Sequence, residues 1–144
     1  MENEQQLITV ETLVQAPVAK VWTHWVTPAH IMAWNAASDD WHTPSATNDL
    51  RVGGKFTSRM EAKDKSMGFD FGGTYTEIRT HALIAYRLGD GLGAREVRVV
   101  FEPVGDATIV RETFAAETTH PIEAQRSGWQ SILNRFKSYV EQRP

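Results

Sequence analysis

Cysteine is absent from this 144-residue sequence, and so are long apolar runs. The lack of cysteine excludes disulfides, thiolate metal ligands and a cysteine nucleophile. No apolar run approaches the roughly 20 residues that a membrane-spanning helix needs, so we expect no membrane association. Segment 1–6 is polar and lacks the features of a signal peptide. Together with the absence of cysteine, this predicts a cytoplasmic protein.

Neither sign of charge dominates, because 18 acidic and 15 basic residues give a net charge of −3. This balance argues against a general nucleic-acid binder. Glycine-rich nucleotide-binding motifs and the GxSxG nucleophile motif are also missing. The histidines lack the HxH or HExxH spacing of metal sites, since they are scattered at His24, His30, His42, His81 and His120. We therefore expect no cofactor, no metal ion and no nucleic-acid partner.

The length fits one domain over residues 1–144. A β-branched segment at 7–15 predicts a strand, and Pro17 and Pro28 each suit the first turn of a short helix. Thr27 is the expected cap of the second helix, which ends near Asn35. Alternating segments between glycine-containing turns, one of them at 89–91, then predict six strands, near 42–48, 54–63, 67–79, 83–88, 95–103 and 107–117.

A long helix of about 21 residues is predicted at the end of the chain, with Thr119 or His120 as its cap. Its apolar stripe includes Trp129, Leu133 and Phe136 and must be buried. The order of elements favours an α+β architecture, a curved seven-stranded antiparallel sheet with the long helix across its concave face. Such a sheet leaves room for a ligand cavity beneath the helix.

Five segments resemble a known family in their order and spacing. They are VQAPVAKVW (Val14–Trp22), PAHIMAW (Pro28–Trp34), DLRVGGKF (Asp49–Phe56), GGTYTEI (Gly72–Ile78) and GWQSILNRFKSYVE (Gly128–Glu141). The sequence resembles the START-like superfamily with the helix-grip fold, in the branch similar to the C-terminal domain of the Hsp90 ATPase activator. This superfamily includes lipid carriers, hormone receptors, cyclases and chaperone partners, so the resemblance implies the fold more firmly than one activity.

The full Hsp90 activator has an additional N-terminal domain that contributes to chaperone binding. Here the first predicted strand begins by about residue 7, so we do not expect a chaperone partner. The sequence is more similar to small single-domain bacterial members that are loosely described as polyketide cyclase-like.

Strand parity assigns one wall of the expected cavity. Phe56 and Met60 share a face of one strand, and Phe69, Phe71 and Tyr75 share a face of the next. We expect Met60 to lie near Phe71, so that these groups all point inward. Such a surface suits a flat hydrophobic ligand, and it equally suits ordinary core packing. The opposite face carries a polar cluster of Arg59, Glu61 and Asp70.

The other wall is expected from Trp129, Leu133 and Phe136 of the last helix. We expect Trp129 to be largely buried. Segment 34–42 adds two tryptophans, two carboxylates and an imidazole. It forms either a polar corner at the cavity mouth, with Trp41 and His42 facing the ligand, or core plugs and a capped turn.

Glu112 shares the parity of Val110 and Phe114 in the last strand. If that face is internal, Glu112 is a buried carboxyl with a raised pKa and a candidate acid, base or ligand anchor. A single bulge would expose it instead.

The leading hypothesis is a protein that binds a small hydrophobic, aromatic or lipid-like molecule between sheet and helix. The alternatives are a cyclase or hydrolase using His42 and Glu112 as catalytic groups, and a chaperone-interacting module. The sequence leaves open whether there is catalysis and whether the protein forms a homodimer.

Overall fold

The computed structural model describes residues 6–89 and 94–142, so the turn expected at 89–91 lies partly outside the described residues. The elements alternate as the sequence predicts, with two short helices after the first strand and a long helix at the end. They are β1 (Leu7–Val14), α1 (Val18–Val26), α2 (Pro28–Trp34), β2 (Trp41–Asn48), β3 (Lys55–Ala62), β4 (Gly68–Arg79), β5 (Leu83–Leu88), β6 (Arg95–Val104), β7 (Ala107–Ala115) and α3 (Ile122–Glu141).

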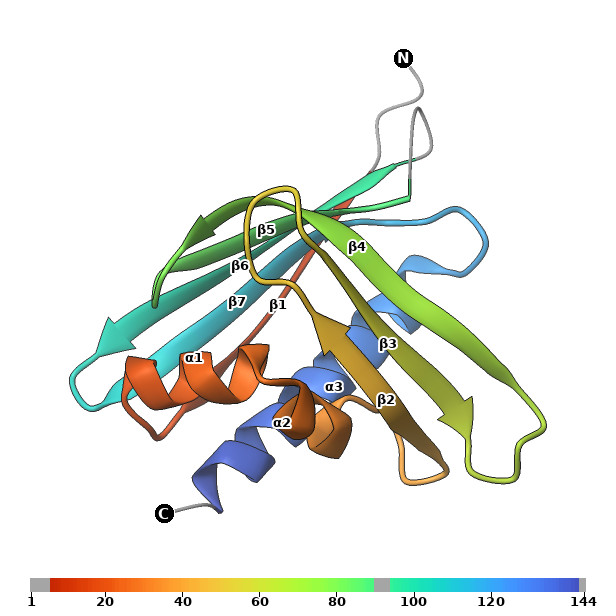
Figure 1. Ribbon diagram of the computed structural model, residues 1–144, viewed down its shortest axis with the longest axis horizontal. Helices are drawn as coiled ribbons and strands as arrows, with labels where there is room; N and C mark the ends of the chain where they lie inside the picture. The colour runs from red at the N-terminus through yellow and green to blue at the C-terminus, as the bar shows by residue number, and fades with distance from the viewer. Residues whose placement is uncertain (1–5, 90–93, 143–144) are drawn as a thin grey trace.

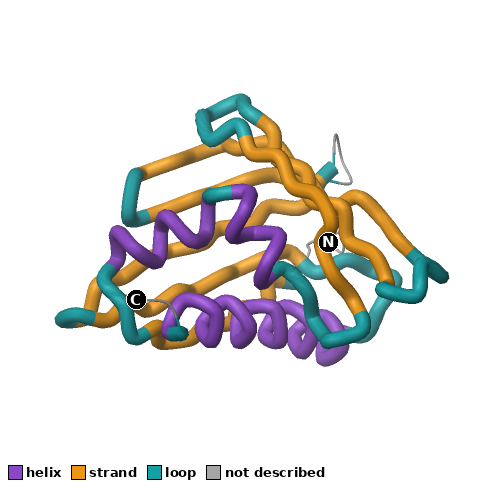
Figure 2. Tube along the Cα trace, turned by 60° about the horizontal axis from the view of Figure 1, so that its bottom comes forward, coloured by secondary structure: helices purple, strands orange, loops and turns teal. Residues whose placement is uncertain are grey.

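The seven strands form one antiparallel sheet in the order β1-β7-β6-β5-β4-β3-β2. Each strand from β2 to β7 therefore neighbours the next in sequence, and β1 closes the far edge beside β7. The sheet curves around the helices, with α3 lying along the side of β1 and β7 and α1 and α2 near one end (Figures 1 and 2). The predicted helix-grip architecture is confirmed.

Two bulges accompany the sheet's curvature. The register shifts between His42 and Ser45 in β2 and between Tyr75 and Glu77 in β4, and an extra residue in one strand bends it and increases its twist. Gly73 lets neighbouring strands approach closely, because a Cβ atom there would lie 2.6 Å from the carbonyl oxygen of Arg87.

The helix starts differ from the expected caps. Thr27 is the N-cap residue of α2, but its side chain makes no capping hydrogen bond. For α3 the N-cap is Pro121, which has no backbone N–H. The carboxylate of Glu117 instead accepts hydrogen bonds from the backbone N–H groups of Thr119 and His120, each at 2.7 Å. The turn before α3 is thus fixed by an upstream carboxylate.

The core lies where α3 crosses the β1 side of the sheet. Leu133, Phe136 and Val140 of α3 are fully buried, as is Phe114 of β7. The indoles of α1 and α2 complete this cluster at one end, through Trp25 and Trp34 against Phe136 with ring centroids 4.8 and 4.9 Å apart. The remaining concave surface, over β2 to β5 and reaching Glu112 of β7, is left for the cavity.

Across residues 6–89 and 94–142, none of the helices combines the length and the apolar character needed to cross a bilayer.

Candidate functional site

A cavity of about 390 Å³ lies between the concave face of the sheet and helices α2 and α3. Most of its lining is apolar or aromatic. From the central strands it receives three aromatic side chains and one thioether that the sequence places on one face, Phe56, Met60, Phe71 and Tyr75. Phe69 also lines it and is 48% exposed, so the cavity reaches the surface there.

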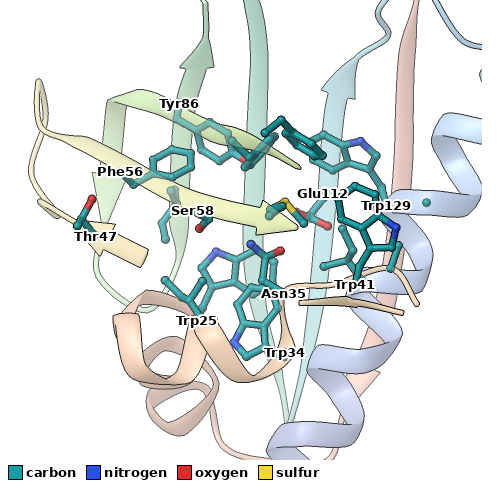
Figure 3. A pocket seen from close by; sticks show the side chains of 18 of the residues that line it. Trp25, Trp34, Asn35, Trp41, Thr47, Phe56, Ser58, Tyr86, Glu112 and Trp129 are labelled. Carbon is teal, nitrogen blue, oxygen red and sulfur yellow. The ribbon is translucent and has the colours of Figure 1, made fainter. Parts of the chain in front are cut away.

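Helix α3 and strand β2 contribute Trp129 and Trp41 to the cavity (Figure 3). Trp129 is partly buried, and one side of it faces the cavity. Its ring stacks on Phe114, with centroids 3.9 Å apart and planes 11° from parallel. Trp41 approaches Phe69 at 5.9 Å between ring centroids. All the predicted ligand contacts except Leu133 and Phe136 therefore line the same cavity.

Leu133 and Phe136 do not line the cavity, which corrects their expected position. Both are fully buried in the core. The apolar stripe of α3 is wide enough to serve two surfaces: Leu133 and Phe136 are buried in the core, whereas Trp129 and Ile132 line the cavity.

His42 also lies outside the lining. It follows the inward-facing Trp41 in β2 and pairs with Glu61 of β3, 3.9 Å from one carboxylate oxygen. Glu61 belongs to the outer cluster with Arg59 and Asp70, and Arg59 donates to both carboxylates. The outer cluster is as expected. The expected polar corner is not formed by His42, whose side chain is 43% exposed.

The register of the β3–β4 hairpin differs from expectation by two residues. Met60 lies opposite Phe69, and Ser58 lies opposite Phe71, whereas Met60 was expected near Phe71. A shift of two preserves side-chain parity, so the inward set is unchanged.

Several cavity residues were missed or given another role by the sequence analysis. Trp34 was expected in a polar corner or a core plug; it lines the cavity and donates its indole N–H to the carbonyl of His24 at 3.0 Å. The other lining residues that were not predicted as ligand contacts are Trp25, Ile31, Asn35, Ala37, Ser38, Thr47, Ser58, Ile84, Tyr86, Gly128 and Ile132. Strand parity alone could have found Tyr86 and Ile84, because they alternate in β5 in the same way as the inward residues of β4.

Glu112 is internal, so no bulge moves it to the outside. It is 6% exposed, and it lies between Val10 of β1 and Val99 of β6 in the sheet. Its carboxyl points into the cavity beside Trp129 (Figure 3). Within the described part of the chain, it makes no hydrogen bond or ion pair. Burial without a partner raises the pKa of Glu112 from 4.5 to about 8.

The two tyrosines of the cavity differ in their polar contacts. The Tyr75 hydroxyl donates to the side-chain oxygen of Asn48. The amide nitrogen of Asn48 donates in turn to the carbonyl of Val26 at 2.7 Å. Burial raises the pKa of Tyr75 and of Tyr86, and a charge on Glu112 raises that of Tyr86 further. Both phenols are therefore neutral hydrogen-bonding groups at neutral pH.

No cluster of three or more His, Asp or Glu side chains that could hold a metal occurs in residues 6–89 and 94–142. The chemistry that the cavity offers is thus a large apolar, aromatic surface together with one carboxyl that titrates near neutral pH. It can sequester an apolar molecule, orient it through Glu112, or exchange a proton with it.

A curved antiparallel sheet gripping a long C-terminal helix, with a cavity between them, defines a helix-grip protein of the START-like class. The family model described as "Activator of Hsp90 ATPase homolog 1-like protein" matches residues 15–141. The chain belongs to this family.

Solved structures agree with this assignment. The solution structure of an AHSA1-like protein from Aeromonas hydrophila is 44% identical, with a TM-score of 0.87 over 95% of this chain and 93% of that one. A Cytophaga hutchinsonii protein is 56% identical, with a TM-score of 0.79 over 94% and 92% of the two chains. A Chromobacterium violaceum protein shares the fold at 21% identity, with a TM-score of 0.80 over 94% and 97%. The comparison with curated proteins gave no match.

Proposed function

We propose that this protein binds a small hydrophobic, aromatic or lipid-like molecule in the cavity between the sheet and α3. The observation that carries this is the cavity itself, about 390 Å³ in volume and lined mostly by aromatic and aliphatic side chains. Protein interiors are normally close-packed, so a space of this size is an exception. Cavities that take small molecules typically measure about 300–1,000 Å³ and are lined in the same manner.

Access to the cavity supports the same proposal. Phe69 lines the cavity and is 48% exposed, and Ser38, in the segment after α2, is another exposed lining residue. A molecule can therefore enter beside Phe69 without unfolding the core. The ligand contacts that we propose are Trp41, Phe56, Met60, Phe69, Phe71, Tyr75 and Trp129.

Binding of the neutral fluorescent probe 1-aminoanthracene tests this function. We expect saturable binding of one probe per protein, with a rise in probe fluorescence as it leaves water. Ile132→Trp adds an indole inside the cavity and should abolish binding. Ile109→Trp is the matched control, because Ile109 lies on the outer face of β7 opposite Glu102. Equal binding by both variants would place the probe elsewhere and contradict the proposal.

An enzyme is the second candidate, and Glu112 is the observation that favours it. A carboxyl with a pKa of about 8 inside an apolar cavity is suited to general acid or base catalysis at neutral pH. In a cyclase or hydrolase of this kind, Glu112→Gln should lower turnover by roughly 10²–10⁴-fold while the probe still binds. His42→Ala should leave turnover unchanged, because His42 lies outside the cavity.

A further inference from the structure

Glu112 is buried in the cavity wall, and none of the described residues that line the cavity carries a positive charge to balance it. Its sheet neighbours on the inward face, Val10 and Val99, are apolar and buried. Helix α3 contributes Gly128, Trp129 and Ile132 to the same cavity lining, and these residues have no titratable group. Within the described residues, no Lys, Arg or His lines the cavity.

The other titratable groups among the described lining residues of the cavity are phenols. Tyr86 of β5 and Tyr75 of β4 line the same cavity, and both stay neutral because burial raises their pKa values. Arg95 of β6 exerts an electrostatic influence on Tyr86, and it donates its Nε–H to the carbonyl of Ala115 at 3.0 Å. Arg95 is not part of the lining. A ligand that enters the cavity can therefore supply the charged partner that the described residues do not give Glu112.

The aromatic lining also favours a positively charged group in a ligand. Indole faces carry negative electrostatic potential, which attracts cations and repels anions. Indoles reach the cavity from α1, α2, β2 and α3, at Trp25, Trp34, Trp41 and Trp129 (Figure 3). A carboxylate ligand would meet Glu112 and these rings, and no Lys, Arg or His among the described lining residues would stabilise it.

We propose that the cavity selects a hydrophobic molecule that carries one basic amine, whose ammonium group pairs with the Glu112 carboxylate among the indole rings. This inference rests on the proposed binding function and names its ligand class. The apolar body of the ligand fills the space over Phe56, Phe71 and Tyr75.

Binding of such an amine should release a proton from the protein. Glu112 is mostly protonated in the empty protein at neutral pH, because its pKa is about 8. A bound ammonium stabilises the carboxylate, so binding of an already protonated amine releases a proton from Glu112 to the solvent. Below about pH 8, affinity for the amine should therefore rise about tenfold for each unit of pH, whereas affinity for a neutral analogue should change little.

Calorimetric titration with three probes of one shape tests the ligand class: naphthylmethylamine, naphthylmethanol and naphthoate. Near pH 8 we expect the amine to bind at least about tenfold more tightly than the alcohol, with naphthoate weakest of the three. Titration in buffers of different ionisation enthalpy near neutral pH should show release of about one proton per bound amine.

Glu112→Gln should retain the alcohol's affinity and lose both the preference for the amine and its pH dependence. Glu102→Gln is the matched control, because Glu102 pairs with Arg111 on the outer face. If the alcohol binds and the amine binds no better, or if Glu112→Gln keeps the amine preference, the ligand class is wrong and the binding function stands. If none of the probes binds, both the ligand class and the binding function fail.

Discussion

Trp129 of α3 stacks face to face on Phe114 of β7, with ring centroids 3.9 Å apart. Phe114 lies two residues beyond Glu112 on the same face of the strand. The stacked pair thus joins the close-packed core, to which Phe114 belongs, to the cavity that Trp129 lines. It also places an indole beside the carboxyl that distinguishes this cavity from a plain apolar pocket.

Glu112 makes stability depend on pH in a direction opposite to that of most carboxyls. Its pKa is 4.5 when exposed and about 8 in the folded protein, so the folded state holds the extra proton between these values. Glu112 therefore has little effect on the free energy of unfolding below pH 4.5, where it is protonated in both states. It lowers that free energy progressively as the pH rises to about 8. Glu112→Gln should stabilise the protein by on the order of 3 kcal/mol near pH 7.

Urea denaturation from about pH 5 to pH 9 measures this effect as the difference between the Glu112→Gln variant and the parent protein. The difference should grow with pH and level off above the folded-state pKa. A constant difference across this range would show that Glu112 titrates normally.

Trp129 and Phe136 lie on the same helix, but substituting them should affect ligand binding and protein stability differently. Phe136 is fully buried in the core, so Phe136→Ala should lower the free energy of unfolding by about 3–5 kcal/mol. Trp129 is half-buried and borders the cavity, so Trp129→Ala should cost about 1–3 kcal/mol and weaken 1-aminoanthracene binding more than tenfold. Chemical denaturation and probe titration of both variants check this. Equal losses of stability, with binding by Trp129→Ala intact, would contradict the division of α3 into core and cavity surfaces.

Tyr75 contacts the cavity through its ring, whereas its hydroxyl is held by Asn48. Tyr75→Phe should therefore lower stability by about 1–2 kcal/mol, because it leaves the Asn48 oxygen without its donor, and should leave probe affinity nearly unchanged. Denaturation together with probe titration gives both quantities. A large loss of affinity would mean that the hydroxyl turns toward the ligand.

The sheet could be predicted from the sequence because turn residues recur at regular spacing and strand side chains alternate with a fixed period. Parity placed Phe56, Met60, Phe71 and Tyr75 on one face, and it placed Glu112 inside once a bulge in β7 is excluded. The β3–β4 register was off by two residues, an error that parity cannot detect because every side chain keeps its face.

The α3 side of the cavity could not be fully predicted, for a physical reason. Apolar periodicity shows which stripe of a helix is buried but not where the helix crosses the sheet. Because α3 lies over β1 and β7, Leu133 and Phe136 became core, whereas Trp129 and Ile132 face the cavity. Similarly, β2 begins with Trp41 inward, which turns His42 outward. The ligand-binding role of the lining residues remains a prediction.

The most direct test of the central claim is the location of a bound hydrophobic molecule, measured by intermolecular nuclear Overhauser effects between 1-aminoanthracene and the protein side chains. The account predicts contacts from the probe to Trp129, Phe71 and Met60, and none to the outer-face residues Ile109 and Arg98. Contacts confined to the outer face, or an absence of saturable binding, would contradict it.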